Sequence, residues 1–272
     1  MINISVIKYY VIRIIEKIPF IQIFIYNYIS NFPFLFPHEK DYFGIKKLID
    51  LNDTNDFIDV GGNIGLSVIG FRKLGYKNRI IIFEPDKNYC VKKLLKLKTK
   101  IAKLKLIQYG LSNKNEDKIF YQAYFLGIKM HFLSSFDKKY LNSILRQVYS
   151  LFNIFFTIKT TKLSLKKFDT LKLKNRPSFI KIDVEGYDHK VIEGMLKTIY
   201  KYKPVILVEQ NKENFYKINK LLRKKYTPYK YIFEKDLFKK VTNKEIFYIN
   251  STFKRNLKLS LPRNIFFIPI KS

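Results

Sequence analysis

The sequence predicts an α/β fold in which helices cover both faces of a mostly parallel sheet with an antiparallel edge strand. Short apolar runs typical of buried strands, such as residues 57–60, 80–83 and 178–184, alternate with segments whose apolar residues recur at helical spacing. Parallel strands joined through helices give an open sheet. The chain ends in short strand-like runs close together, of which residues 264–269 are the last. These closely spaced strands predict the antiparallel edge.

A glycine-rich turn follows the first strand, in the sequence Phe-Ile-Asp-Val-Gly-Gly-Asn-Ile-Gly at residues 57–65. Its glycines are Gly61, Gly62 and Gly65. Glycine lets the backbone approach a ligand, and an acid at the end of the next strand accepts hydrogen bonds from ribose hydroxyls. Glu84 is such an acid, because it directly follows the apolar residues 80–83. The pattern predicts a nucleotide-binding βαβ unit, and the alternative is an ordinary turn between a strand and a helix.

The spacing of these glycines bears on which nucleotide binds. A dinucleotide site has the pattern G-x-G-x-x-G, in which the third glycine lets helix and strand pack around a pyrophosphate. Here the spacing differs, and Asp59 precedes the glycines. A carboxylate at this place repels phosphate and attracts a cationic ligand. S-adenosylmethionine carries a sulfonium and an amino group and no phosphate, so the sequence favours this cofactor over NAD.

The composition indicates one large domain with a basic surface. The 272 residues are 47% hydrophobic and 27% charged, and their net charge is +30. This charge suits a polyanionic partner, either nucleic acid or an anionic membrane surface. The alternative is a coding bias, since Lys, Ile, Asn, Tyr and Phe are abundant, Trp is absent and the only alanines are Ala102 and Ala123. We favour the bias, because the lysines are scattered along the chain.

Cysteine and histidine are too few for a metal framework. Cys90 is the only cysteine and there are three histidines. A single cysteine excludes an intramolecular disulfide and a cysteine-based zinc site. We therefore expect no metal and a reducing, cytoplasmic setting.

An apolar helical segment is expected at residues 1–45, ahead of a main domain at residues 46–272. Residues 18–37 are uncharged over a length that spans a bilayer, but three prolines and several polar residues argue against a spanning helix. No small-residue cleavage site follows the apolar residues, so we do not expect a secretory signal. Either helices pack on the domain, which we slightly prefer, or residues 1–43 make a peripheral membrane contact with their basic side chains towards lipid head groups.

Within the main domain, residues 119–168 form an irregular and strongly aromatic insertion on the expected substrate side. Such a segment builds either a second small core or a lid over an acceptor, because aromatic faces suit sugar rings and planar substrates as well as each other. The sequence favours neither the second core nor the lid.

A second group of charged residues ends the strand at residues 178–184. Asp183 and Glu185 close this strand and Lys181 precedes them, with a glycine and a helix next. Ligands bind beyond the carboxyl ends of strands in open α/β sheets. Five acids close predicted strands and are expected to face one crevice: Asp59, Glu84, Asp183, Glu185 and Glu209.

Residues 57–65 with Phe-Glu-Pro at 83–85, and residues 179–194 with their Lys-Ile-Asp-Val-Glu-Gly motif, resemble the FkbM-type S-adenosylmethionine-dependent methyltransferases. The resemblance covers about residues 50–269 and implies a seven-stranded, Rossmann-like class I methyltransferase fold. It also implies methyl transfer, usually to an oxygen, often on sugars in polysaccharide or glycolipid assembly. One departure is Gly62, where alanine is more usual. The other lies at residues 187–189, where small and acidic residues are common.

The resemblance also implies roles for individual residues. The residues expected around the methionine part of the cofactor are Asp59, Gly61, Gly62, Asn63 and Gly65. Glu84 is expected at the ribose, and Leu111 and Ser112 near the adenine. Asp183 and Glu185 are expected to face the site of methyl transfer as catalytic residues.

Methyl transfer to a hydroxyl requires an aligned acceptor oxygen and a group that accepts its proton. Our hypothesis is that Asp183 or Glu185 is this base, with His131 and His189 as reserve candidates and Lys181 steering an anionic acceptor.

There are three alternatives to this function. An RNA methyltransferase fits the charge, but we find no Asn/Asp-Pro-Pro-aromatic motif and no suitably placed cysteine, so nucleic acid is not the expected partner. An NAD-dependent oxidoreductase is disfavoured by the glycine spacing. The third is a non-catalytic scaffold that binds a membrane or a glycan-assembly partner.

Overall fold

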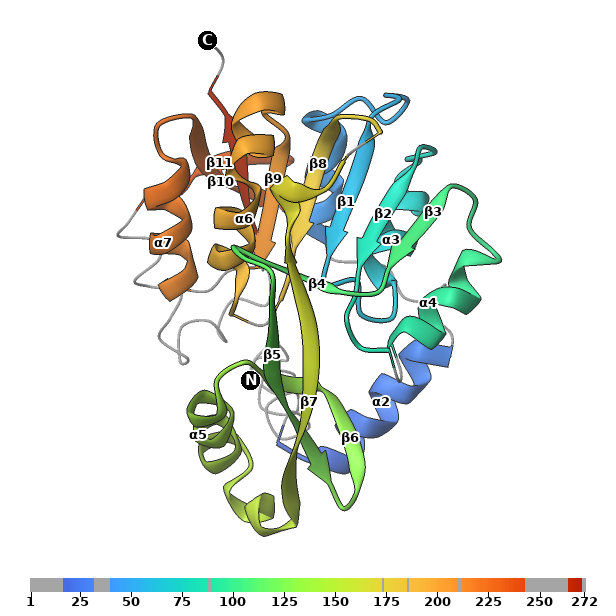
Figure 1. Cartoon of the computed structure of the whole chain (residues 1–272), viewed down its shortest axis with the longest axis vertical. Helices are drawn as coiled ribbons and strands as arrows, with labels where there is room; N and C mark the ends of the chain where they lie inside the picture. Colours follow the sequence, from blue (N-terminus) through green and yellow to red (C-terminus); the bar gives the residue numbers. More distant parts are fainter. Residues whose placement is uncertain are drawn as a thin grey trace, which may run out of the picture.

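The computed structural model describes residues 17–31, 40–87, 90–172, 174–184, 186–209, 212–242 and 264–270. Two sheets organise these residues. Figure 1 shows the larger sheet in the upper part of the molecule and the long strands β5 and β7 of the smaller sheet running below it. The strands of the larger sheet are β1 (Asp56–Val60), β2 (Ile80–Phe83), β3 (Leu104–Ile107), β8 (Pro177–Ile182), β9 (Val205–Glu209), β10 (Tyr226–Ile232), β11 (Leu237–Lys240) and β12 (Asn264–Pro269).

The larger sheet has the order β11-β10-β12-β9-β8-β1-β2-β3. Strands β3, β2, β1, β8 and β9 are parallel, whereas β12 runs antiparallel to both of its neighbours and β11 antiparallel to β10. The predicted fold class is confirmed, with eight described strands in the larger sheet where seven were expected. The last strand of the chain lies inside the sheet and β11 forms the edge. In this interior position Ile265 and Phe266 pack on opposite faces of the sheet, and both are fully buried.

Helices cover both faces of the larger sheet, and each face has its own core. Alternate residues of a strand point to opposite faces, so in β1 Ile58 packs in one core and Phe57 in the other. The first core includes α6 (Asp188–Tyr202) and α7 (Lys212–Leu222). The second includes α3 (Leu66–Lys73), α4 (Cys90–Lys98) and the 3-10 helix η2 (Lys40–Lys47).

Residues 104–112 form two strands that belong to different sheets. The first is β3, and the second is β4 (Gly110–Ser112), which pairs with β7 (Phe156–Lys167) in the smaller sheet. At Gly110 a β-carbon would lie 2.6 Å from Leu165 Cδ2, so a larger residue at this crossing would displace the Leu165 side chain. The smaller sheet has the order β4-β7-β5-β6, with β5 at Glu116–Phe125 and β6 at Ile128–Ser135.

The aromatic insertion contributes most of this smaller sheet and has a core of its own. Besides β5, β6 and β7 it contains α5 (Lys138–Val148) and the 3-10 helix η3 (Ser150–Phe155). Their shared core consists of Ala123, Phe125, Met130, Leu133, Leu141, Leu145 and Tyr149. The same sheet also forms one wall of the cavity described below, so the second-core and lid interpretations are not exclusive.

The N-terminal helix α2 (Pro19–Asn31) packs on the smaller sheet, beside β6 in Figure 1. The rings of Phe20 and Phe125 meet edge to face at 4.8 Å, and the Tyr149 hydroxyl donates to Gln22 Oε1 at 2.6 Å. Residues 1–16 and 32–39 of the predicted apolar segment lie outside the described residues. Among the helices that are described, none has the length and hydropathy needed to cross a bilayer.

Candidate active site

A cavity of about 850 Å³, including its open mouth, lies between the carboxyl ends of β1, β2 and β8 and the inner face of the smaller sheet. Five of the predicted site residues line it: Gly61, Asn63, Glu84, Leu111 and Asp183. They come from segments far apart in the chain, and the parallel strands bring them to one edge, as expected for an open α/β sheet. Its lining combines apolar side chains with a few polar and charged ones, as is common in small-molecule sites.

The glycine turn holds β1 and β8 together at this edge. Gly61 has φ +81°, and a β-carbon there would lie 2.0 Å from the carbonyl oxygen of Asp183. Gly62 does not line the cavity but faces Ile82, whose Cγ2 would lie 2.2 Å from a β-carbon. The buried Ile82 therefore explains why this chain has glycine where alanine is more usual. Gly65 has φ +88° at the start of α3 and likewise lies behind the cavity wall.

Glu84 is 6% exposed, and both of its carboxylate oxygens accept backbone hydrogen bonds. The amides of Asn63 and Asp86 donate to Oε2 and Oε1, each at 2.8 Å. Burial is the main reason that the pKa of Glu84 rises to about 7, with the negative charges of Asp86 and Asp59 adding to it. Each oxygen has a second lone pair, so the carboxylate can still accept from a ligand hydroxyl in the cavity.

Lys181 lies between two of the predicted acids. Its ammonium is 3.1 Å from Asp183 Oδ2 and 3.8 Å from Asp59 Oδ1, and its side chain is only 8% exposed. Burial opposes its charge, but the two carboxylates raise the pKa of Lys181 well above its ordinary value. Asp59 also accepts a hydrogen bond from the Ser67 hydroxyl, and burial raises the pKa of Asp59. Lys181 is therefore an internal counter-ion, a different role from steering an acceptor.

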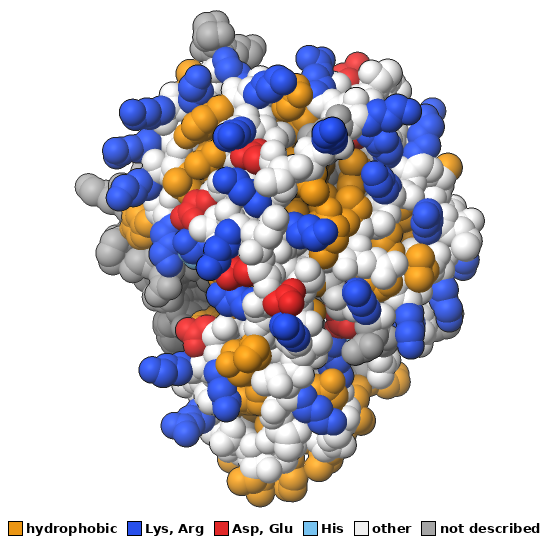
Figure 2. All heavy atoms as spheres, in the orientation of Figure 1, with side chains coloured by type: hydrophobic (Ala, Val, Ile, Leu, Met, Phe, Trp, Pro, Cys, Tyr) orange, Lys and Arg blue, Asp and Glu red, His pale blue; other side chains and the backbone are white. Residues whose placement is uncertain are grey.

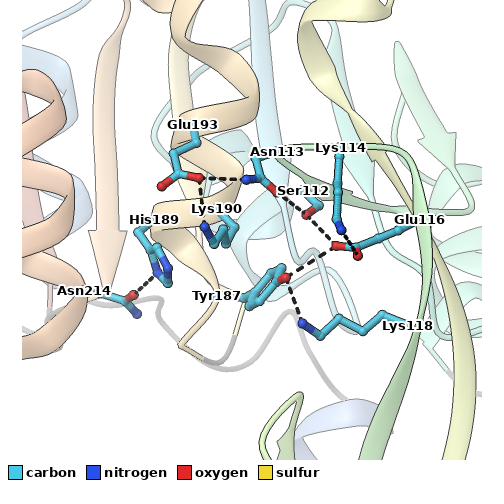
Figure 3. A network of polar contacts seen from close by, with 10 residues as sticks. All are labelled: Ser112, Asn113, Lys114, Glu116, Lys118, Tyr187, His189, Lys190, Glu193 and Asn214. Carbon is cyan, nitrogen blue, oxygen red and sulfur yellow. Dashed lines mark hydrogen bonds and ion pairs between the residues drawn. The ribbon is translucent and has the colours of Figure 1, made fainter.

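The other predicted residues lie away from the cavity or outside the described chain. Ser112 is buried and does not line the cavity; its hydroxyl donates to Glu116 at 3.2 Å in the network of Figure 3. Gly194 explains its close packing, because a β-carbon there would lie 2.0 Å from the Ser112 carbonyl oxygen. Glu185 lies outside the described residues. Glu209 is exposed and is not among the residues that line the cavity.

The two reserve histidines differ in position. His131 lines the cavity, and burial followed by the charge of Lys129 lowers the pKa of His131 to about 4, so its ring is neutral near pH 7. His189 lies outside the cavity lining and its Nδ1 is 2.8 Å from Asn214 Oδ1, as Figure 3 shows.

Several cavity contacts could not be anticipated from the sequence because distant segments supply them. The Tyr26 hydroxyl of α2 donates to Asn63 Oδ1 at 3.0 Å, and the Tyr26 ring stacks on His131 at 4.9 Å. Lys129 of β6 forms an ion pair with Asp86, and both line the cavity. Among these residues, only Asp86 could have been noticed in the sequence, because it is an acid two residues after Glu84. Nothing in the sequences of α2 and β6 indicated that they contribute to the cavity.

Phe120, Phe136 and Tyr187 form an aromatic wall. The ring of Phe136 lies 4.8 Å from the ring of Phe120 and 4.8 Å from that of Tyr187. All three are half-buried, and the first two line the cavity. Lys118 donates to the Tyr187 hydroxyl at 2.9 Å and lies 4.5 Å from the centre of its ring. Figure 3 shows the Tyr187 hydroxyl between Lys118 and Glu116.

The sequence profile of the FkbM methyltransferase domain matches residues 59–241, from the acid before the glycine turn to just beyond β11. The chain belongs to the FkbM methyltransferase family. The predicted family and enzyme class are therefore confirmed, and membership implies S-adenosylmethionine as the methyl donor. A search of curated proteins found no match.

Three solved structures are similar to this FkbM-family chain. Methyltransferase FkbM from Methylobacillus flagellatus KT is 14% identical, with a TM-score of 0.48, and the alignment covers 81% of this chain and 45% of that one. The fibrillarin/Nop5p complex is 11% identical over 85% of this chain and 79% of that one, with a TM-score of 0.41. Precorrin-6y C5,15-methyltransferase from Geobacter metallireducens GS-15 is 12% identical over 85% and 86%, with a TM-score of 0.39. The chain thus spans less than half the length of the first structure.

Proposed function

We propose that this protein transfers a methyl group from S-adenosylmethionine to a hydroxyl on a sugar, a glycan or a related small molecule, in polysaccharide or glycolipid assembly. One observation carries the proposal. A single cavity is lined by the glycine turn, Glu84, Asp183 and the aromatic side chains of Phe120 and Phe136. A donor bound against the turn and Glu84 and an acceptor bound against the aromatic side chains would share this cavity with Asp183.

The cofactor end of the cavity fits S-adenosylmethionine. Gly61 lines the cavity and has no side chain, so its backbone is open to the methionine part of the ligand. Glu84 would accept hydrogen bonds from the ribose hydroxyls, and Leu111 offers an apolar contact for the adenine. Asp59, Gly62, Gly65 and Ser112 would act from behind the wall by shaping the turn and strand β4. When bound, the cofactor supplies a methyl group already activated by its sulfonium.

Asp183 is our candidate for the group that accepts the acceptor's proton. Among the strand-end acids of the described chain, it alone lines the cavity with a substantially exposed side chain, at 40%. Lys181 orients this carboxylate through Oδ2 at 3.1 Å. The proton of the acceptor hydroxyl would pass to Asp183 and then to solvent. Glu185, the second candidate, follows two residues later.

The aromatic wall supports a ring-shaped acceptor. The flat apolar face of a sugar ring stacks on aromatic side chains, and Phe120 and Phe136 present such faces within the cavity. A ring held there would place a hydroxyl towards Asp183. Alignment of this kind is the main contribution that a protein makes to transfer from an activated donor.

Calorimetric titration with S-adenosylmethionine tests the cofactor half of the proposal. We expect micromolar binding that is lost in Asp59→Ala, because removal of this acid leaves Lys181 facing the turn with one counter-ion fewer. A folded wild-type protein that did not bind would refute the assignment and leave a scaffold as the better description.

The acceptor half is tested by methyl incorporation into a panel of sugars, glycolipids and RNA. We expect Asp183→Asn to lower turnover at least tenfold without changing the affinity for S-adenosylmethionine. The matched control is Asp117→Asn, since Asp117 is a half-exposed acid on the smaller sheet that does not line the cavity. Equal turnover in the two variants would exclude Asp183 as the base. Methylation of RNA alone would contradict the proposed acceptor class.

A further inference from the structure

Large hydrophobic side chains are exposed together at the end of the smaller sheet farthest from the main sheet. The five residues of this apolar tip, with their exposed fractions, are Leu126 (55%), Ile128 (47%), Leu151 (87%), Ile154 (84%) and Phe155 (44%). The tip is one surface, because the amide of Leu126 in the β5–β6 hairpin donates to the carbonyl oxygen of Phe155 in η3 at 3.1 Å. Figure 2 shows hydrophobic side chains gathered at the lower end of the molecule, where Figure 1 places this hairpin and η3.

Helix α2 extends the apolar surface from the tip. Phe20 packs against Phe125, which directly precedes the hairpin, yet it remains 53% exposed, and Phe24 one turn later is 72% exposed. In the described part of α2, from residue 19 to residue 31, there is no charged residue. The tip and α2 therefore present a continuous uncharged edge.

Coding bias explains an abundance of Ile, Leu and Phe but not their concentration at one convex end. A side chain that is more than four-fifths exposed, as in Leu151 and Ile154, contributes little to the core of its own chain. No residue of η3 is buried. Contiguous exposed apolar patches of this kind mark interaction sites.

The charges around the tip have one sign. Between residues 119 and 160 the exposed basic residues are Lys138, Lys139, Arg146 and Lys159, whereas Lys129 is paired with Asp86 in the cavity. The same segment has one acid, Asp137, whose carboxylate caps α5 by accepting from two backbone amides. A protruding apolar tip surrounded by basic residues matches the layered chemistry of an anionic bilayer, with apolar chains below phosphate head groups.

We propose that the apolar tip inserts into the head-group region of an anionic membrane, with the basic residues of α5 and β7 at the lipid phosphates. The contact is peripheral, because it involves the β5–β6 hairpin, η3 and one face of helix α2. It extends the membrane contact that was the alternative interpretation of the N-terminal segment to η3 and to the β5–β6 hairpin. It does not depend on the proposed methyl acceptor.

Sedimentation of the full chain with lipid vesicles tests the proposal. Vesicles of phosphatidylcholine mixed with phosphatidylglycerol are expected to bind the protein, and vesicles of phosphatidylcholine alone to bind it much more weakly. The double substitution Leu151→Asn with Ile154→Asn should lower binding by about 100-fold, because each lost apolar side chain contributes about tenfold. The matched control is Leu95→Asn with Leu237→Asn, two side chains that are 45% and 42% exposed on α4 and β11.

The outcomes distinguish between a membrane and a second copy of the chain as the partner of the apolar tip. Loss of binding in the tip variant with retention in the control supports the proposal. Three results would overturn it: no binding by the wild type, equal binding by the tip variant and the wild type, or equal loss in the control. Sedimentation velocity without lipid adds a fourth, because self-association abolished by the tip substitutions would assign the surface to a second copy of the chain.

Discussion

The substitution Gly61→Ala tests the close approach of β1 and β8 on which the candidate site depends. Gly61 has φ +81°, and a β-carbon there would lie 2.0 Å from the carbonyl oxygen of Asp183 and 3.1 Å from Val184 Cγ1. Two costs follow. An alanine with positive φ costs about 1–2 kcal/mol, and overpacking against a backbone that must move costs about 1–3 kcal/mol more. We therefore expect a loss of about 2–5 kcal/mol in the free energy of unfolding.

The matched control is Gly127→Ala in the β5–β6 hairpin. Gly127 has φ +80°, and nothing lies within 4 Å of a β-carbon placed there. It carries the same conformational cost without the collision, so we expect a loss of only about 1–2 kcal/mol. The effect of alanine on the unfolded chain is common to both variants and cancels in the comparison.

Urea unfolding followed by circular dichroism measures the two losses, and titration with S-adenosylmethionine supplies a second readout. Displacement of the Asp183 backbone should weaken cofactor binding in Gly61→Ala but leave it unchanged in Gly127→Ala. Equal losses of stability, within about 0.5 kcal/mol, would refute the packing argument. Unchanged binding in a destabilised Gly61→Ala variant would show that the turn serves the fold alone.

Three further substitutions probe the cavity. Burial raises the pKa of Glu84 from 4.5 to about 7, so the folded state binds more protons than the unfolded state in this window and loses stability as pH rises through it. Glu84→Gln should remove that part of the slope in urea titrations made below and above the window, and an unchanged slope would contradict the burial. Lys181→Met leaves Asp59 and Asp183 without their cation and should lower the free energy of unfolding by about 3–5 kcal/mol, which thermal melting would detect; a shift in midpoint near zero would count against the ion pair. Tyr26→Phe should weaken S-adenosylmethionine binding about fivefold by removing one hydrogen bond to the glycine turn, and calorimetry showing no change would separate α2 from the cofactor site.

Periodicity and strand-end residues were sufficient to predict the architecture and part of the site. The glycine turn, Glu84 and Asp183 were recognised because a parallel sheet places the ends of its strands at one edge, whatever lies between them in the chain. Burial of β12 inside the sheet was not predicted, because an apolar run has no periodicity that distinguishes an interior strand from an edge strand.

Local sequence determined which backbone elements form and which chemical groups stand at their ends. Tertiary structure decided what those groups contact. It placed Lys181 between Asp59 and Asp183, turned Ser112 away from the cavity, and brought Tyr26 of the N-terminal helix to the glycine turn. Contacts of this kind depend on how two sheets pack against each other, and residues on separate elements carry no mutual signal in a single sequence.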